Sequence, residues 1–292
     1  MKRENGLRQL LSREEIFVLP GIYDCISARI AEQAGFEAIF TSGFGISAST
    51  LGMPDYGYLT VTEMIWTVKR IINSVSIPVI VDIDTGYGNP LNVIRTVKEI
   101  ININASGVII EDQEWPKKCG HFENKSVVPK QEHIEKIKSA VEARQNHNLL
   151  IIARTDSRAV NGLKDAIKRG ELYIDAGADM LFIEAPETTE ELEEIAKAFP
   201  DTPLLANMVE GGRTPLLSAS KLQDMGYKIA VYPVSGLFSS TLAINRCFEY
   251  LFNNKSTEGF SDMWKFERFE QFIDKPSHIV LEKKFSTKAN SD

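Results

Sequence analysis

The sequence alternates about eight times between short runs of apolar, β-branched residues and longer stretches with helical periodicity. Continuous apolar strands that alternate with helices are typical of a parallel sheet covered on both faces. Eight such units predict an α/β fold, a closed (β/α)8 TIM barrel, and the structural alternative is a doubly wound open sheet. The predicted strands are residues 16–20, 38–43, 78–84, 107–113, 149–156, 180–186, 203–209 and 229–235.

The stretches between these runs carry recognisable helix signals. The pairs Thr60–Glu63 and Thr188–Glu191 each fit a capping box that opens a helix. In residues 91–101 the apolar spacing predicts a helix with one buried face. That predicted face consists of Leu91, Ile94, Val97 and Ile101.

Length and composition predict one globular domain over residues 1–292. The chain is 43% hydrophobic, which is enough to bury a sizeable core. A C-terminal helical extension is predicted from about residue 255. The apolar face of its segment SDMWKFERFEQFI needs a partner on its own barrel or on a neighbouring subunit. The net charge of −7, with Lys and Arg scattered among the acids, disfavours nucleic acid and membrane partners. No run of about 18 apolar residues and no secretory signal pattern is evident, which predicts a cytoplasmic protein.

The three cysteines are far apart and form no CxxC pair, so neither a disulfide framework nor a zinc ribbon is expected. Cys25 and Cys247 lie in helical patterns and are interpreted as buried core thiols. Cys119 instead lies in the connection from Gln113 to Pro129, which is longer than most βα loops and is therefore predicted to be an active-site lid.

Within that lid, the hexapeptide PKKCGH surrounds Cys119 with basic residues. The positive field of Lys117 and Lys118 favours the thiolate and predicts a lowered pKa for Cys119. Gly120 permits backbone conformations that other residues resist. The hexapeptide is thus a candidate for chemistry.

Polar or ionisable residues follow six successive predicted strands. The carboxyl ends of parallel barrel strands meet at one mouth, where collecting such groups is costly unless a ligand uses them. The sequence therefore predicts a ligand site there. The strand-end residues are Thr41, Ser42, Gly43, Asp82, Asp84, Glu111, Asp112, Arg154, Asp156, Glu184 and Asn207.

A metal site is predicted at the third and fourth of these strands. Asp82 and Asp84 are two residues apart and leave the same face of a strand, and Glu111 follows the next strand. Carboxylate oxygens without histidine suit Mg²⁺, or Mn²⁺, better than zinc. The alternative is that Asp84 caps the turn that follows and Asp82 pairs with Arg154.

These motifs resemble the isocitrate lyase and phosphoenolpyruvate mutase superfamily from about residue 7 to residue 250. The resemblance is closest to its 2,3-dimethylmalate lyase, methylisocitrate lyase and oxaloacetate hydrolase branch, and KKCGH is the superfamily's lyase signature. It implies a TIM barrel that binds Mg²⁺ and a small carboxylic acid, in a homotetramer (a dimer of dimers) whose eighth helix is swapped between subunits. The motifs that carry it are TSGFG, LGMPDYG, VDIDTGYGNP, GVIIEDQ, PKKCGH, IIARTDSRAV, FIEAP and LANMVEGGRTP.

The resemblance also implies roles for individual residues. The metal positions match Asp82, Asp84 and Glu111. The catalytic positions match Cys119, Lys117, His121, Arg154 and Glu184. The substrate-binding positions match Ser42, Gly43, Phe44, Asp55, Gly120, Asn207 and Arg213.

The activity implied is a carbon–carbon lyase acting on a 2-hydroxy or 2-oxo dicarboxylic acid, with Cys119 protonating an enolate. Methylisocitrate lyases of this superfamily place an arginine where this chain has Phe238, which disfavours a tricarboxylate, although Arg213 could supply charge. The alternative is a phosphonomutase acting on carboxyphosphonoenolpyruvate or phosphoenolpyruvate. Phosphoenolpyruvate mutases tend to carry asparagine at the position of Cys119. A non-catalytic oxo-acid-binding barrel is a more remote alternative.

Overall fold

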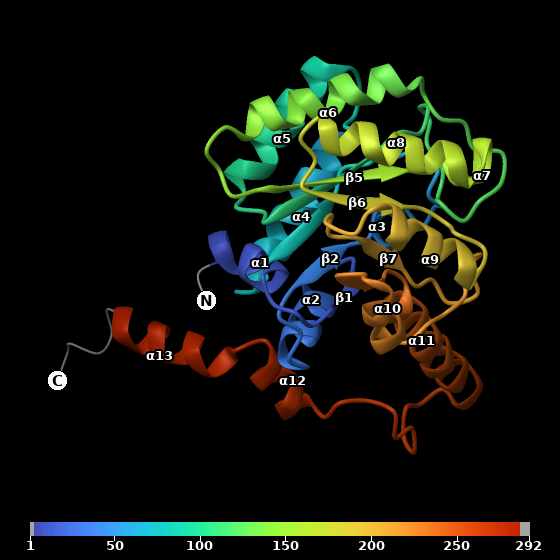
Figure 1. Ribbon diagram of the computed structural model, residues 1–292. Helices are drawn as coiled ribbons and strands as arrows, with labels where there is room; N and C mark the ends of the chain where they lie inside the picture. Colours follow the sequence, from blue (N-terminus) through green and yellow to red (C-terminus); the bar gives the residue numbers. More distant parts are fainter. Residues whose placement is uncertain (1–2, 287–292) are drawn as a thin grey trace. The chain divides into compact units, whose positions relative to one another are not determined.

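The computed structural model describes residues 3–286, and the chain divides after Phe238 into two compact units. The first unit holds eight parallel strands in the order β6-β5-β4-β3-β2-β1-β8-β7. A parallel bridge between Leu181 and Leu204 joins the two ends of this sheet, so the barrel is nearly closed and the predicted TIM barrel is confirmed (Figure 1). The strands are β1 (Phe17–Ile22), β2 (Ile39–Thr41), β3 (Val79–Asp82), β4 (Gly107–Glu111), β5 (Leu150–Thr155), β6 (Met180–Ile183), β7 (Leu205–Asn207) and β8 (Ile229–Tyr232).

The helices of the first unit lie outside the strands (Figure 1). Thr60 and Glu63 form the predicted reciprocal capping box, and the Thr188 side chain accepts a hydrogen bond from the Glu191 N–H. The helices are α1 (Arg3–Leu11), α2 (Cys25–Gln33), α3 (Gly43–Leu51), α4 (Val61–Ser74), α5 (Pro90–Asn102), α6 (Lys130–Arg144), α7 (Ser157–Asn161), α8 (Leu163–Asp175), α9 (Thr189–Ala198), α10 (Ala219–Met225) and α11 (Ser235–Asn254), which continues into the second unit.

The buried face of α5 differs from the predicted one. Val93, Val97 and Ile100 are fully buried, whereas Leu91 is 75% exposed. Leu91 and Ile100 are nine residues apart, which is two and a half helical turns, so they lie on opposite sides of the helix. The prediction for Leu91 was therefore wrong.

The barrel interior explains where the strand-end side chains lie. Ile80, Ile109 and Ile152 belong to the apolar cluster inside the barrel, while their neighbours Val81, Val108 and Ile151 pack outward against the helices. Side chains alternate between the two faces of a strand. The residue two positions after each interior isoleucine therefore points into the barrel at its mouth, and these residues are Asp82, Glu111 and Arg154.

The second unit contains the end of α11 together with α12 (Phe266–Phe272) and α13 (Lys275–Phe285). Trp264 stacks edge-on against Phe272, with ring centroids 5.3 Å apart. Cys247 in this unit and Cys25 in α2 are both half-buried. The interpretation of these thiols as buried core residues was therefore wrong. The buried residues of α2 are Ala28 and Ala31, and α11 has no buried residue.

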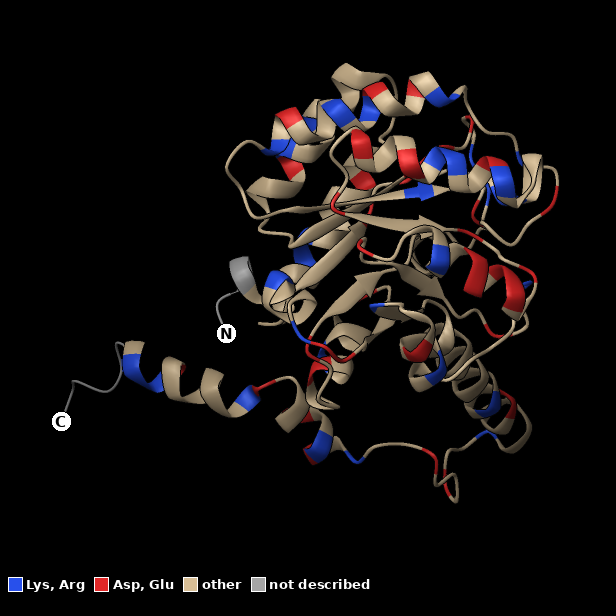
Figure 2. Ribbon diagram, in the orientation of Figure 1, with Lys and Arg blue, Asp and Glu red and all other residues tan. Residues whose placement is uncertain are grey.

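Charged residues of both signs are interspersed along the outer helices of the barrel (Figure 2). Within residues 3–286, no helix is long and apolar enough to cross a bilayer.

Candidate active site

A pocket of about 280 Å³ opens at the carboxyl ends of the barrel strands. It is lined by Arg154, Glu184 and Asn207 from β5, β6 and β7, and is covered by the long β4–α6 loop. The structure thus brings together most of the residues predicted for the site. Those that line the pocket are Ser42, Gly43, Phe44, Asp55, Asp82, Cys119, Gly120, His121, Arg154, Glu184, Asn207 and Phe238.

Three further predicted residues, Asp84, Glu111 and Lys117, are buried beside this pocket. The Lys117 Nζ lies 2.6 Å from Asp84 Oδ1 and 2.8 Å from Asp55 Oδ1. Burial opposes the ammonium, but the charges of Asp84 and Asp55 outweigh it and raise the pKa of Lys117 well above its usual range. Lys117 is therefore a permanent cation within this group of carboxylates.

The carboxylates themselves resist ionisation in this environment. Burial raises the pKa of Asp84 to about 6, although Lys117 opposes the shift. Burial also raises the pKa of Glu111 well above its usual range, against the attraction of Arg154. A buried carboxylate with a raised pKa is stabilised in its charged form by an additional cation.

The donor set of this group fits a hard divalent metal. Within residues 3–286, no three or more His, Cys, Asp or Glu side chains are already arranged as a metal cluster. The buried Glu111 Oε1 nevertheless has no hydrogen-bond partner. A Cβ on Gly43 would lie only 2.8 Å from Asp82 Oδ2, so glycine leaves room beside the carboxylates. All-oxygen donors with such room suit Mg²⁺.

The predicted alternative, an Asp82–Arg154 pair, is not what the structure shows. Asp82 Oδ1 accepts the backbone N–H of Asp84 at 3.0 Å. Arg154 is engaged elsewhere. Its Nε lies 2.9 Å from Asp156 Oδ2 and 3.3 Å from Glu111 Oε2, and its second terminal nitrogen (Nη2) lies 3.1 Å from Glu184 Oε2. Burial disfavours the charged guanidinium, but the three carboxylates prevail and raise the pKa of Arg154.

The loop that carries Cys119 is folded over the pocket. An antiparallel bridge between Gln113 and Val127 forms its base. At its tip, the Cys119 N–H donates a 3.1 Å hydrogen bond to the carbonyl of Asp55. Gly120 lies against the Arg154–Glu184 pair, because a Cβ there would be 2.4 Å from atoms of both side chains.

The predicted lowering of the Cys119 pKa was wrong. Burial raises it to about 11. Lys117 is paired with Asp55 and Asp84, and the Lys118 ammonium points away to donate to the Asn124 carbonyl at 2.8 Å. The thiol is therefore protonated at neutral pH.

His121 and Arg213 connect the loop to the segment after β7. The Arg213 N–H donates to His121 Nδ1 at 3.0 Å, so a neutral His121 carries its proton on Nε2, which lies 3.5 Å from Glu184 Oε1. The Arg213 side chain reaches Glu123 and Glu187 and does not line the pocket.

One wall of the pocket is aromatic. The ring of Phe44 packs edge-on against both Phe122 and Phe238, with centroids 6.4 Å apart in each pair. Sequence reasoning singled out Phe44 and Phe238 but missed Phe122, although it directly follows PKKCGH. Among the described residues that line the pocket, Arg154 is the one lysine or arginine, so this wall offers no cation.

Sequence reasoning also missed Lys125 and Glu210. Lys125 is buried and pairs with Asp156. Glu210 lines the pocket and accepts a hydrogen bond from the Ser235 hydroxyl. A lysine in a loop and a glutamate in EGGRTP give little signal by themselves, because only the folded chain brings them to these partners.

A family model described as phosphoenolpyruvate phosphomutase matches residues 7–250. The 2,3-dimethylmalate lyase of Eubacterium barkeri is 42% identical over 268 residues, which cover 91% of this chain and 92% of that protein. The chloroplastic carboxyvinyl-carboxyphosphonate phosphorylmutase of Arabidopsis thaliana is 44% identical over 293 residues, covering 99% of this chain and 86% of that protein. The family match over residues 7–250 includes all eight barrel strands.

Solved structures give the same result for the fold. Oxaloacetate acetylhydrolase bound to the inhibitor 3,3-difluorooxalacetate superposes with a TM-score of 0.93 at 31% identity, covering 97% of each chain. Phosphonopyruvate hydrolase in complex with oxalate and Mg++ superposes with a TM-score of 0.88 at 27% identity, covering 98% of this chain and 99% of that one. A divalent metal thus accompanies this fold in at least one relative.

Proposed function

Because this chain belongs to the phosphoenolpyruvate phosphomutase family, we propose that it is an Mg²⁺-dependent carbon–carbon lyase. Its substrate is a small 2-hydroxy or 2-oxo dicarboxylic acid of the dimethylmalate, methylisocitrate or oxaloacetate type. The similarity to 2,3-dimethylmalate lyase supports this substrate class. The product is a 2-oxo acid (or oxalate, where a 2-oxo acid is cleaved as its hydrate) with a carboxylate fragment. A cytoplasmic location stays a prediction from the sequence.

The observation that carries the proposal is the position of Cys119. Its thiol lines the same pocket as Asp82 and Arg154, on a loop that covers the strand ends. A thiol with a pKa near 11 is a proton donor at neutral pH, which is what a carbanionic intermediate requires. A phosphoryl-transfer reaction has no comparable use for a group that donates a proton to carbon.

The charge of the pocket supports a metal requirement. Asp82, Glu184 and Glu210 line it, and Arg154 is already paired with carboxylates. An anionic substrate is repelled by such a surface unless a cation is added. Asp82, Asp84 and Glu111 would hold Mg²⁺, which when bound polarises the substrate's hydroxyl and carboxylate oxygens.

The residues of this chain then act in sequence on a 2-hydroxy acid. The C2 hydroxyl loses its proton, for which Glu184 is the candidate acceptor, and the C2–C3 bond breaks with its electron pair left on the departing fragment. The resulting carboxylate enolate is stabilised by the positive charge of Arg154. The Cys119 S–H bond then breaks and its proton forms the new C–H bond, while the closed loop excludes water.

The aromatic wall favours a substrate with an alkyl substituent. Phe44, Phe122 and Phe238 present apolar ring surface and no cation to the pocket. A third carboxylate there would be desolvated without a partner, which is costly. A dicarboxylate fits this wall better than a tricarboxylate.

A second candidate function is the phosphonomutase reaction. The 44% identity to a carboxyvinyl-carboxyphosphonate phosphorylmutase favours it. The oxo-acid and metal positions would serve both reactions, so the fold alone does not decide between them.

We also propose a homotetramer with exchange of the helix after β8. No residue of α11 is buried, although Ile244, Phe248 and Phe252 follow one another at four-residue intervals along one face of it. A contiguous apolar face of this kind marks an interaction surface. That residues 1–292 form one domain, with a helical extension from about residue 255, also stays a prediction.

The deciding experiment offers the purified protein 2,3-dimethylmalate, methylisocitrate, oxaloacetate and phosphonopyruvate, each with and without Mg²⁺. Release of 2-oxo acid or oxalate, and phosphorus NMR, are the readouts. We expect turnover of a dicarboxylate only when Mg²⁺ is present. Turnover of phosphonopyruvate alone would overturn the lyase proposal, and turnover of none would favour a non-catalytic barrel.

A further inference from the structure

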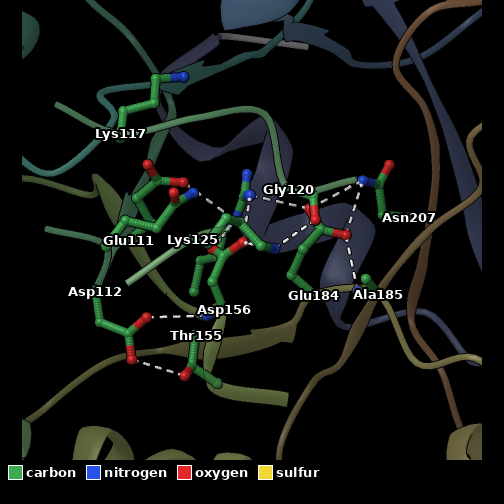
Figure 3. A network of polar contacts seen from close by, with 12 residues as sticks. Glu111, Asp112, Lys117, Gly120, Lys125, Thr155, Asp156, Glu184, Ala185 and Asn207 are labelled. Atoms are coloured by element: carbon green, nitrogen blue, oxygen red, sulfur yellow. Dashed lines mark hydrogen bonds and ion pairs between the residues drawn. The ribbon is translucent and has the colours of Figure 1, made fainter. Parts of the chain in front are cut away.

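The loop over the pocket is tied down by a lysine that the proposed chemistry does not use. Lys125 lies six residues after Cys119, near the end of the same loop. Its side chain is 1% exposed, and its Nζ lies 2.6 Å from Asp156 Oδ1. The same Nζ donates to the backbone carbonyl of Gly120. One ammonium thus joins the tip of the loop to the barrel (Figure 3).

The barrel partner of Lys125 is also the partner of Arg154. Asp156 accepts from Arg154 Nε at 2.9 Å and from the Nη2 of Arg154 at 3.1 Å, in addition to Lys125. Burial by itself disfavours the charged carboxylate, but Arg154 and Lys125 together hold the pKa of Asp156 far below its usual range. Asp156 is therefore a fixed anion shared by a loop residue and a pocket residue.

The backbone of Asp156 is itself fixed by a buried hydrogen-bond network around Asp112. Asp112 accepts the Asp156 N–H at 2.9 Å and the Thr155 hydroxyl at 2.7 Å (Figure 3). Asp112 also accepts hydrogen bonds from Arg169 and Tyr173. All of these side chains are buried. The anion that Lys125 contacts is therefore a rigid part of the barrel, whereas Lys125 belongs to the loop.

From this arrangement we propose that Lys125 is a positioning residue that latches the loop shut and couples closure to the orientation of Arg154. When the loop closes, Lys125 reaches Asp156, and Gly120 comes to rest against the Arg154–Glu184 pair. When it opens, Asp156 loses one of its cations and Arg154 loses the loop backbone that covers it. Closure of the loop and orientation of Arg154 are a single event.

The chain supplies a matched control in Lys118. It lies on the same loop, but its ammonium donates to the Asn124 carbonyl within the loop and, outside the loop, faces the ring of Tyr56 at 6.0 Å from the ring centroid. Removing the charge of Lys118 therefore changes the loop's net charge without breaking the latch. The pair Lys125→Met and Lys118→Met separates the two effects.

The first test uses the unmodified protein and labels its lysines with acetic anhydride, read by mass spectrometry. Lys125 should react about tenfold or more slowly than Lys118, because it reacts only when the loop opens. Adding Mg²⁺ and oxalate should slow Lys125 further and leave Lys118 unchanged. Equal labelling of the two lysines, with and without oxalate, would overturn the proposal even if no variant folds.

The second test compares the two variants by limited proteolysis of the loop and by kinetics. In Lys125→Met, oxalate should still bind by calorimetry but should no longer protect residues 113–129 from cleavage. Its kcat should fall about tenfold or more, with a smaller change in KM, because the lost contact is made only in the closed state. Lys118→Met should match the unmodified protein, and a Lys125→Met loop that oxalate still protects would refute the latch.

The kinetic part rests on the proposed lyase function, whereas the labelling of Lys125 and Lys118 without ligand does not. If no substrate is turned over but Lys125 is protected relative to Lys118, the proposed function fails and the latch stands. If a substrate is turned over and Lys125→Met behaves like Lys118→Met, the latch fails and the function stands.

Discussion

Replacing Gly120 by alanine tests the closed geometry of the active site with a single methyl group. A Cβ at this position would lie 2.4 Å from the Arg154 Nη2 and 2.4 Å from Glu184 Oε2. Van der Waals contact needs about 3.5 Å, so something must move by about 1 Å. Arg154 cannot retreat easily, because Asp156 and Glu111 hold it from the other side.

The loop is the part that can yield, and the expected cost is therefore catalytic. A displacement of about 1 Å in a catalytic group costs about a hundredfold in rate, or ~2.7 kcal/mol of transition-state stabilisation. The free energy of unfolding should change by less than about 1 kcal/mol, because a lifted surface loop leaves the core intact.

The assay is kcat/KM on whichever acid the substrate panel identifies, together with thermal unfolding. Gly236→Ala is the matched control, because its added methyl would meet only the Gly21 carbonyl at 3.6 Å, an ordinary contact. A Gly120→Ala enzyme with kcat/KM within about threefold of the unmodified protein, well under the hundredfold expected from a 1 Å shift, would refute the closed geometry. A parallel loss of activity and stability would instead make Gly120 a structural residue.

Cys119→Ser should lower kcat by about a hundredfold or more, the usual contribution of a general acid, while calorimetric oxalate binding persists; an active variant would exclude the thiol as proton donor. Asp84→Asn should weaken Mg²⁺ binding in a calorimetric titration because it removes a charged oxygen ligand, and an unchanged affinity would exclude Asp84 from the site. Burial lowers the pKa of His133 to about 3, whereas the unfolded chain has a histidine pKa of about 6.5. The stability contributed by the neutral ring is therefore fully present above pH 6.5 and is lost as the pH falls from about 6.5 toward 3. Between pH 7 and pH 5 the free energy of unfolding, measured with denaturant, should fall by about 2 kcal/mol. It should fall less in His133→Phe, which keeps a ring against Tyr173. An equal fall in both proteins would show that His133 does not carry the pH dependence.

Much of the fold and of the site could be predicted from the sequence, because both depend on local periodicity. Strand period decides which side chains share a face, so Asp82, Glu111 and Arg154 could be placed at one mouth once the strands were recognised. The helix face of α5 was predicted less well, because a helix that starts at Pro90 with several apolar residues allows more than one assignment of its buried side.

The spacing of residue types along the chain was enough to predict the order of strands and helices, the polar strand ends and the long loop that carries Cys119. The same spacing could not predict what the lysines of that loop do. Lys117 pairs with Asp55 and Asp84, 62 and 33 residues away, and Lys125 pairs with Asp156, 31 residues away. Charge in a folded protein acts through distance and burial, neither of which is encoded by proximity in sequence. That is why the neighbouring lysines predicted a lowered pKa for Cys119 and the packed loop raises it.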